Sequence, residues 1–221
     1  MLLTELERII RRSLSSGAMD WLEQKIGLVK TEEKNLQLNL AFSHIPRFVE
    51  KKTIALQPSE VAEINQKLPG FDVSGWSADR LARVYLLMQV PDKDKEVYLR
   101  KINGLFTAAE MNEQAALYSA LPVFSYPQEW IHRCEEGIRS NIGTVLEAIM
   151  YHNPYPARYL SENSWNQLVL KAFFTEKDVT RITGIKERKN KALSETLKDY
   201  VQERLAAHRT VHPEIYKLIE M

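Results

Sequence analysis

One run of the sequence, His152 to Phe174, gathers side chains suited to polar chemistry. It combines prolines, asparagines, a glutamine, a tryptophan, tyrosines and a lysine with apolar residues at helical spacing. Amide side chains weaken helices and are costly to bury without hydrogen-bond partners. Two interpretations follow. The amides either tie a turn to neighbouring helices or line a pocket for a polar ligand.

The motif NPYP opens this run. Pro154 and Pro156 restrict the backbone, and a proline after Asn153 disfavours helical geometry at that asparagine. We expect a rigid turn that presents Asn153 and Tyr155 in fixed directions. If the run forms a pocket, Tyr155 and Trp165 are expected to wall it.

A second group of polar residues precedes NPYP. Arg139, Gly143 and Glu147 follow one another at intervals of four, which predicts that they stack on one helix face. Asn141 is placed to cap that helix or to contact a ligand. Together with later residues these form a candidate polar ridge. The ridge comprises Arg139, Asn141, Glu147, Asn153, Tyr155, Trp165, Asn166, Gln167, Lys171, Tyr200, Glu203 and Arg204.

The sequence offers little for metal, cofactor or nucleic-acid chemistry. The histidines show no HExxH spacing, and no glycine-rich phosphate loop or G-x-S-x-G motif is present. The most basic run, KERKNK at 186–191, is interrupted by Glu187 and contains no aromatic residue. This favours a solvated turn over a nucleic-acid contact. We therefore expect no metal, no cofactor and no nucleic-acid partner.

Composition indicates an ordinary globular protein. Of the 221 residues, 44% are hydrophobic and 27% charged, and the net charge is only +1. A single cysteine, Cys134, excludes an intrachain disulfide and fits a reducing compartment. No apolar stretch approaches the roughly 20 residues that a transmembrane helix needs. We expect a soluble, cytoplasmic protein that does not insert into membranes.

The elements that must position these residues are predicted to be helices. Apolar residues recur at helical period nearly throughout, and no segment alternates as a strand does. Capping boxes are predicted at Thr107 with Glu110 and at Ser125 with Gln128. The predicted helices cover residues 2–15, 18–28, 32–45, 58–68, 77–89, 93–106, 108–121, 126–138, 141–151, 161–174, 189–208 and 213–219.

Helices of this length with short connectors favour antiparallel neighbours. Helix pairs repeat loosely between residues 77 and 174. We expect an all-α fold in which these pairs stack as a right-handed, HEAT-like αα-superhelix. Glycines and a proline cluster at 68–79, which suggests a small N-terminal helical subdomain at 1–70 and a body at 77–221. A long surface loop within one domain is the alternative.

Four segments in this order closely resemble the EboA family: EGIRSNI (136–142), NPYP (153–156), WNQLVLKA (165–172) and DYVQERLAAHR (199–209). AEMNEQAALYSALP (109–122) and GIKERKN (184–190) match as well, so the resemblance runs from about Ser77 to Ile215. The sequence departs from the family pattern at Glu110, Gln202 and His208, where the family often has Asp, His and Gly. A mechanism based on a histidine at position 202 is therefore not supported here.

The resemblance implies a place in the ebo gene cluster, which is linked to making or exporting a small secondary metabolite. We favour a non-catalytic accessory protein that holds a polar intermediate or docks another ebo-cluster protein. The alternative is a metal-independent enzyme acting on a cyclitol- or phosphate-bearing intermediate. In that enzyme, Arg139 and Lys171 would bind an anion, and Glu147 or Glu203 would act as acid and base.

Overall fold

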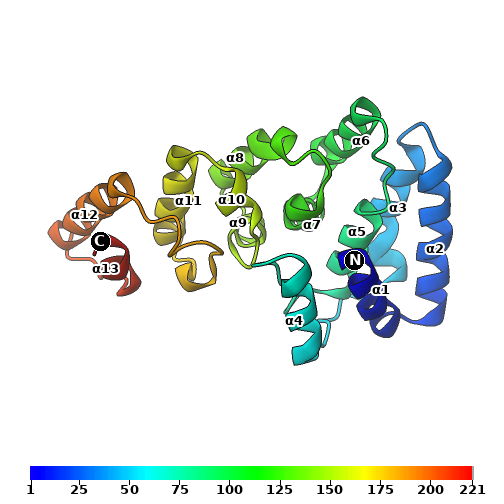
Figure 1. The fold of residues 1–221 in the computed structure, drawn as a ribbon, viewed down its shortest axis with the longest axis horizontal. Helices are drawn as coiled ribbons and strands as arrows, with labels where there is room; N and C mark the ends of the chain where they lie inside the picture. Colours follow the sequence, from blue (N-terminus) through cyan, green and yellow to red (C-terminus); the bar gives the residue numbers. More distant parts are fainter. Residues whose placement is uncertain (221) are drawn as a thin grey trace.

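The computed structural model describes residues 1–220, which form helices joined by turns and loops (Figure 1). The predicted all-α fold is confirmed. The helices are α1 (Leu2–Ser13), α2 (Ser16–Thr31), α3 (Leu36–Phe48), α4 (Pro58–Lys67), α5 (Ala78–Leu87), α6 (Lys95–Ala108), α7 (Met111–Ser119), α8 (Ile131–Arg139), α9 (Gly143–Met150), α10 (Tyr155–Tyr159), α11 (Glu162–Phe174), α12 (Lys191–Ala206) and α13 (Glu214–Ile219). Short 3₁₀ helices lie at η1 (Leu121–Val123), η2 (Pro127–Trp130) and η3 (Val179–Arg181).

The two predicted capping boxes are wrong. Thr107 lies in the last turn of α6, where its hydroxyl donates to the carbonyl of Asn103 at 3.1 Å. The hydroxyl of Ser125 donates to the carboxylate of Asp92 instead of capping a helix. A hydroxyl inside or beside a helix can bond to whichever acceptor is close, so spacing alone does not fix its role. The box occurs at Glu110, which caps α7.

The NPYP motif contains a helix that the sequence did not predict. The short α10 begins at Tyr155 and has Pro156 in its first turn. A proline is tolerated there because the first amides of a helix have no partner within it. Asn153 precedes the helix, and its side-chain oxygen accepts the N–H of Tyr155 at 3.0 Å. The motif is therefore a turn that leads directly into a helix.

The helices follow one another along an elongated molecule (Figure 1). At its centre α5 packs on α7 and α7 packs on α9. Helices α1, α2 and α3 pack against α5 near one end, and the pair α12–α13 lies at the other. This succession brings alternate helices into contact, but it does not show a regular HEAT-like superhelix. That finer arrangement stays a prediction.

The segment 68–79 is a loop as far as Ser77, with a buried apolar side, and its last two residues begin α5. Phe71, Val73 and Trp76 are buried, and the rings of Phe71 and Trp76 meet edge to face with centroids 5.7 Å apart. Residues on both sides of the segment belong to the same hydrophobic core. The division into units at 1–70 and 77–221 stays a prediction.

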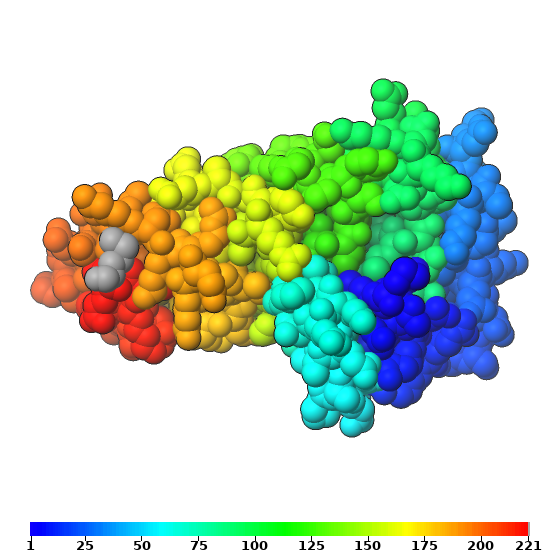
Figure 2. Space-filling view, in the orientation of Figure 1, coloured from blue at the N-terminus to red at the C-terminus, as the bar shows by residue number. Residues whose placement is uncertain are grey.

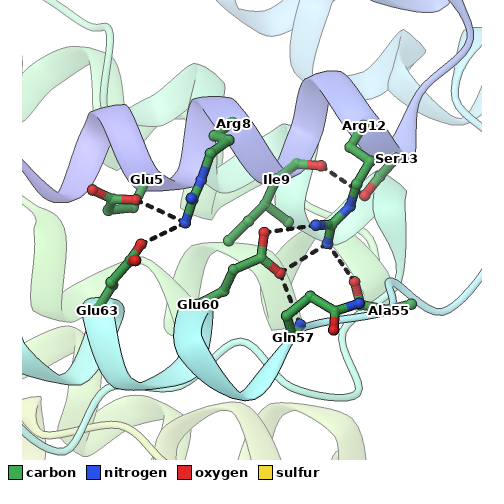
Figure 3. Close-up of polar contacts among 9 residues, drawn as sticks. All are labelled: Glu5, Arg8, Ile9, Arg12, Ser13, Ala55, Gln57, Glu60 and Glu63. Atoms are coloured by element: carbon green, nitrogen blue, oxygen red, sulfur yellow. Dashed lines mark hydrogen bonds and ion pairs between the residues drawn. The ribbon is translucent and has the colours of Figure 1, made fainter.

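Helix α4 projects from the molecule beside α1 (Figure 2). Ion pairs connect the two helices: Arg12 bonds Glu60 at 2.7 and 2.9 Å, and Arg8 bonds Glu63 (Figure 3). Glu60 also accepts the N–H of Gln57, which caps α4. Among residues 1–220, no helix is both long and apolar enough to cross a bilayer.

Candidate functional site

A polar cavity of about 280 Å³ lies beside the segment 68–79 and the first residues of α5. We call it the Arg80 pocket. Its wall is made by Ser74, Gly75, Trp76, Arg80, Glu147, Tyr151, His152 and Arg181. These residues come from the loop, the start of α5, the end of α9 and η3. The site therefore depends on segments that are far apart in the sequence.

Backbone hydrogen bonds between these segments fix the pocket. The N–H of His152 donates to the carbonyl of Arg181 at 3.0 Å, and the carbonyl of His152 accepts the N–H of Asp72 at 3.2 Å. His152 thereby ties the loop to η3. Its φ of 51° is left-handed, a conformation that costs energy for a residue with a side chain and is held here by its neighbours.

The guanidinium group of Arg80 is a partly buried positive charge in the wall of the pocket. It lies 4.6 Å from the centre of the Trp76 ring, and its Nε donates to the hydroxyl of Ser119 at 2.8 Å. Burial lowers the pKa of Arg80 to about 10. Within residues 1–220, no carboxylate lies within ion-pair distance of this guanidinium. A partly buried cation that hydrogen-bonds to a neutral hydroxyl and lies over an aromatic ring is well placed to receive an anion.

Arg181 supplies a second cation to the same cavity. Its guanidinium stacks 4.2 Å from the Tyr151 ring, and its Nε donates to Nε2 of His152 at 3.3 Å. His152 can accept this bond only while its ring is neutral. Burial lowers the pKa of His152, which favours the neutral form. Two guanidinium groups therefore border one small polar cavity.

Glu147 is the acidic member of the pocket. It pairs with Lys177 at 2.6 Å, and Lys177 also lines a neighbouring cavity of about 380 Å³. That second cavity includes Tyr200 and Arg204 from the candidate polar ridge. The Glu147–Lys177 pair therefore joins the walls of two neighbouring cavities. The arrangement can bind a small anion and offer it a carboxylate acceptor.

Several predicted ridge residues lie inside the protein. Tyr155 and Trp165 are fully buried, and neither lines the Arg80 pocket. Tyr155 instead donates to the carbonyl of Pro127 across helices. Trp165 lies beneath the guanidinium of Arg188, and its indole N–H has no hydrogen-bond partner within residues 1–220. Their large apolar surfaces are more stable in the core than at a surface.

Asn153 is also buried, and its contacts are backbone groups. Its amide nitrogen donates to the carbonyls of Tyr118 at 3.1 Å and Ala148 at 2.8 Å. Together with the Tyr155 amide, these bonds join the end of α7, α9 and α10. They satisfy the polar atoms of a buried amide, as burial requires.

The predicted stacking is wrong for Arg139, whereas Gly143 and Glu147 lie four residues apart in α9 as expected. Arg139 ends α8, whereas Gly143 begins α9, and the chain is extended between them. Asn141 does not cap α9, because the N-cap position is Ile142. The side chain of Asn141 accepts a hydrogen bond from Lys171 at 2.8 Å. Spacing by four indicates a shared face only where the helix is continuous.

The remaining ridge residues are dispersed. Asn166 and Asn190 exchange two side-chain hydrogen bonds of 3.1 and 2.9 Å, which join α11 to the start of α12. Gln167 and Glu203 are exposed. Arg204 donates to the carbonyl of Thr210 at 2.8 Å. The ridge is therefore distributed over several sites and does not converge on one cavity.

Sequence reasoning missed Arg80 and Arg181. Neither belongs to a recognisable motif: Arg80 lies in the first turn of α5, and Arg181 is the last residue of η3. One signal was present: Arg80 directly follows the segment 68–79, where glycines and a proline cluster. The pairing of that loop with η3 could not be found from local pattern. Among residues 1–220, no cluster of three or more His, Cys, Asp or Glu side chains is placed to hold a metal.

Fold and site together define an all-α protein with a polar cavity bordered by two arginines. A family model described as "Metabolite traffic protein EboA" matches residues 2–220, so the chain belongs to the EboA family. The resemblance found in the sequence is thereby confirmed over nearly the whole chain. Searches of curated proteins and of solved structures returned no match.

Proposed function

We propose that this protein binds a small anionic metabolite in the Arg80 pocket and holds it without changing it chemically. The observation that carries the proposal is Arg80 itself, a partly buried cation that borders a polar cavity and has no carboxylate within ion-pair distance among residues 1–220. Removing a cation from water is costly unless an anion or several hydrogen bonds compensate it. A carboxylate or phosphate on the ligand would provide that compensation.

The rest of the cavity supports an oxygen-rich ligand. The planar guanidinium groups of Arg80 and Arg181 match carboxylate and phosphate oxygens through paired hydrogen bonds. Ser74 and Tyr151 add hydroxyl groups, and Glu147 adds an acceptor for a ligand hydroxyl. A volume of about 280 Å³ suits a compact metabolite.

The family description, metabolite traffic, is consistent with reversible holding. We propose other proteins of the ebo cluster as the partners that deliver or receive the metabolite. The enzymatic alternative remains a prediction: Glu147 is ion-paired with Lys177, and Glu203 is exposed on α12. We see no specific observation that favours it over binding.

The substitution Arg80→Met tests the proposal, because it keeps most of the apolar stem and removes the charge. Inorganic phosphate serves as the probe, and thermal unfolding is measured with increasing phosphate. At ten times its dissociation constant, phosphate should raise the melting temperature of the unsubstituted protein by about 3–6 °C. The substituted protein should show no such rise. Without phosphate it should be at least as stable, since an uncompensated cation is gone.

Arg100→Met is the matched control, because Arg100 is an exposed arginine of α6 outside the pocket. It should respond to phosphate as the unsubstituted protein does. If Arg80→Met keeps the full phosphate response, the anion binds elsewhere and the proposal fails. If Arg80→Met lowers stability and the unsubstituted protein shows no phosphate response, Arg80 is a structural residue and not a ligand contact.

A further inference from the structure

A third cavity lies near the C-terminal end of the described chain, between η3, the segment that follows it and α13. Its volume is about 550 Å³, within the range that small ligands usually occupy. Val179, Ile185 and Leu218 give it an apolar surface. It shares no lining residue with the Arg80 pocket. We call it the C-terminal cavity.

Lysines surround this apolar surface. Lys186, Lys189 and Lys217 line the cavity, whereas Glu214 is its only acidic lining residue and pairs with Lys217 at 2.6 Å. Lys189 donates to the backbone carbonyl of Lys217. Within residues 1–220, neither Lys186 nor Lys189 has an ion-pair partner. The rim is therefore positive in a chain whose overall net charge is only +1.

The basic run KERKNK explains how this rim forms. Arg188 turns inward, where its guanidinium lies 4.9 Å from the Trp165 ring and donates to the carbonyl of Leu160 at 3.0 Å. Lys186 and Lys189, on either side of it, line the C-terminal cavity. The run therefore divides into an arginine that joins helices and two lysines that border a cavity. In a turn that was solvated throughout, these three side chains would not be divided in this way.

We propose that the C-terminal cavity binds an amphipathic anion, a small molecule with an apolar body and one carboxylate, phosphate or sulfonate group. The body would cover Val179, Ile185 and Leu218, and the charged group would lie beside Lys186 and Lys189. Burial of the apolar body supplies most of the affinity, and the lysines select for an anion. Single-stranded nucleic acid fits less well, because its bases need aromatic platforms and the lining residues include none.

Two fluorescent probes with the same aromatic body test this proposal. One is 8-anilinonaphthalene-1-sulfonate, which is anionic, and the other is N-phenyl-1-naphthylamine, which lacks the sulfonate. The sulfonate should bind the full-length protein more tightly than the neutral probe. The double substitution Lys186→Gln with Lys189→Gln should weaken sulfonate binding by roughly five- to tenfold. The same substitution should leave binding of the neutral probe unchanged.

Lys191→Gln with Lys198→Gln is the matched control, since both lysines are exposed on α12 outside the cavity. It should change the binding of neither probe. Ile185→Ser should weaken both probes, because it removes apolar surface from the cavity. Arg80→Met should keep full sulfonate binding, which separates this proposal from that of the Arg80 pocket.

Three results would overturn the proposal. The first is that the two probes bind equally well. The second is that the control pair reduces sulfonate binding as much as the cavity pair does. The third result involves a single-stranded DNA oligonucleotide. If the cavity pair lowers its binding and leaves sulfonate binding intact, the lysines form a nucleic-acid contact. Melting curves of each variant show whether a change in binding reflects loss of the fold.

Discussion

His152 shows how one residue can serve both the fold and the pocket. Its backbone joins the loop 68–79 to η3, and its ring accepts a hydrogen bond from Arg181. Burial lowers the pKa of His152 below its ordinary value of 6.5. The folded state therefore prefers the neutral ring more strongly than the unfolded chain does. Stability from this preference is present above pH 6.5 and is lost as the pH falls through 6.5 towards the folded pKa.

We expect His152→Asn to reduce the pH dependence of stability between pH 8 and pH 5. Asparagine tolerates the left-handed backbone of this position but does not titrate there. The measurement is the free energy of unfolding in urea at several pH values. The unsubstituted protein should lose more stability on acidification than the variant does. Each unit of difference between the folded and unfolded pKa corresponds to about 1.4 kcal/mol.

His208→Asn is the control for this experiment. His208 has the same φ of 51° but is exposed at the end of α12. Its substitution should leave the pH dependence of the unsubstituted protein unchanged. If both variants behave alike, His152 does not titrate differently in the folded state, and its bond to Arg181 has no energetic consequence.

At the scale of elements, the attachment of α4 to α1 depends on one ion pair more than on the others. Glu60 is 3% exposed and is held by Arg12, which lowers the pKa of this carboxyl (Figure 3). Arg8 and Glu63 form a second pair between the same helices, but both side chains are largely in solvent. A buried carboxylate that loses its partner is costly, whereas exposed pairs contribute little.

We therefore expect Arg12→Met to lower the melting temperature by several degrees. The same change at Arg8, whose exposed side chain pairs with Glu5 and Glu63, should lower it by less than about 2 °C. Differential scanning calorimetry at pH 7 measures both variants. Because the pKa of Glu60 is lowered in the fold, this stability is present above its ordinary value of 4.5 and is lost as the pH falls below it. Equal effects of the two substitutions at pH 7 would contradict the assignment.

At the scale of the whole molecule, one hydrophobic core extends from α1 to α13. Trp21 lies in α2 near one end, and Trp165 lies in α11 towards the other. Stacked helical arrays can lose cooperativity when neighbouring units interact weakly. The continuous core predicts that both ends unfold together.

Urea unfolding followed by tryptophan fluorescence tests this expectation. Two variants each keep one reporter, Trp21 or Trp165, and replace the other tryptophans with phenylalanine. Their fluorescence transitions should have the same midpoint as helix loss followed by circular dichroism in the same variant. A transition of Trp21 at lower urea than helix loss would show an N-terminal unit that unfolds independently, which is the division that the sequence suggested.

The sequence by itself determined the helical class, most helix positions and the family. These depend on local information: Leu81, Val84 and Tyr85 recur with helical period and are buried on α5, within the predicted helix 77–89. Pro58 lies in the first turn of α4, within the predicted helix 58–68. Local signals failed where backbone and side chain had several possible partners, as at Thr107.

The tertiary structure alone decided which polar residues converge. Arg80 and Arg181 border one cavity because the loop 68–79 hydrogen-bonds to the segment containing His152 and η3. Trp165, the most conspicuous residue of the polar run, is buried and takes no part in that cavity. Helical period reports which face of a helix is apolar, but it carries no information on which distant helix covers that face. Which distant segment covers each face determines both that Trp165 is buried and that Arg80 borders a cavity.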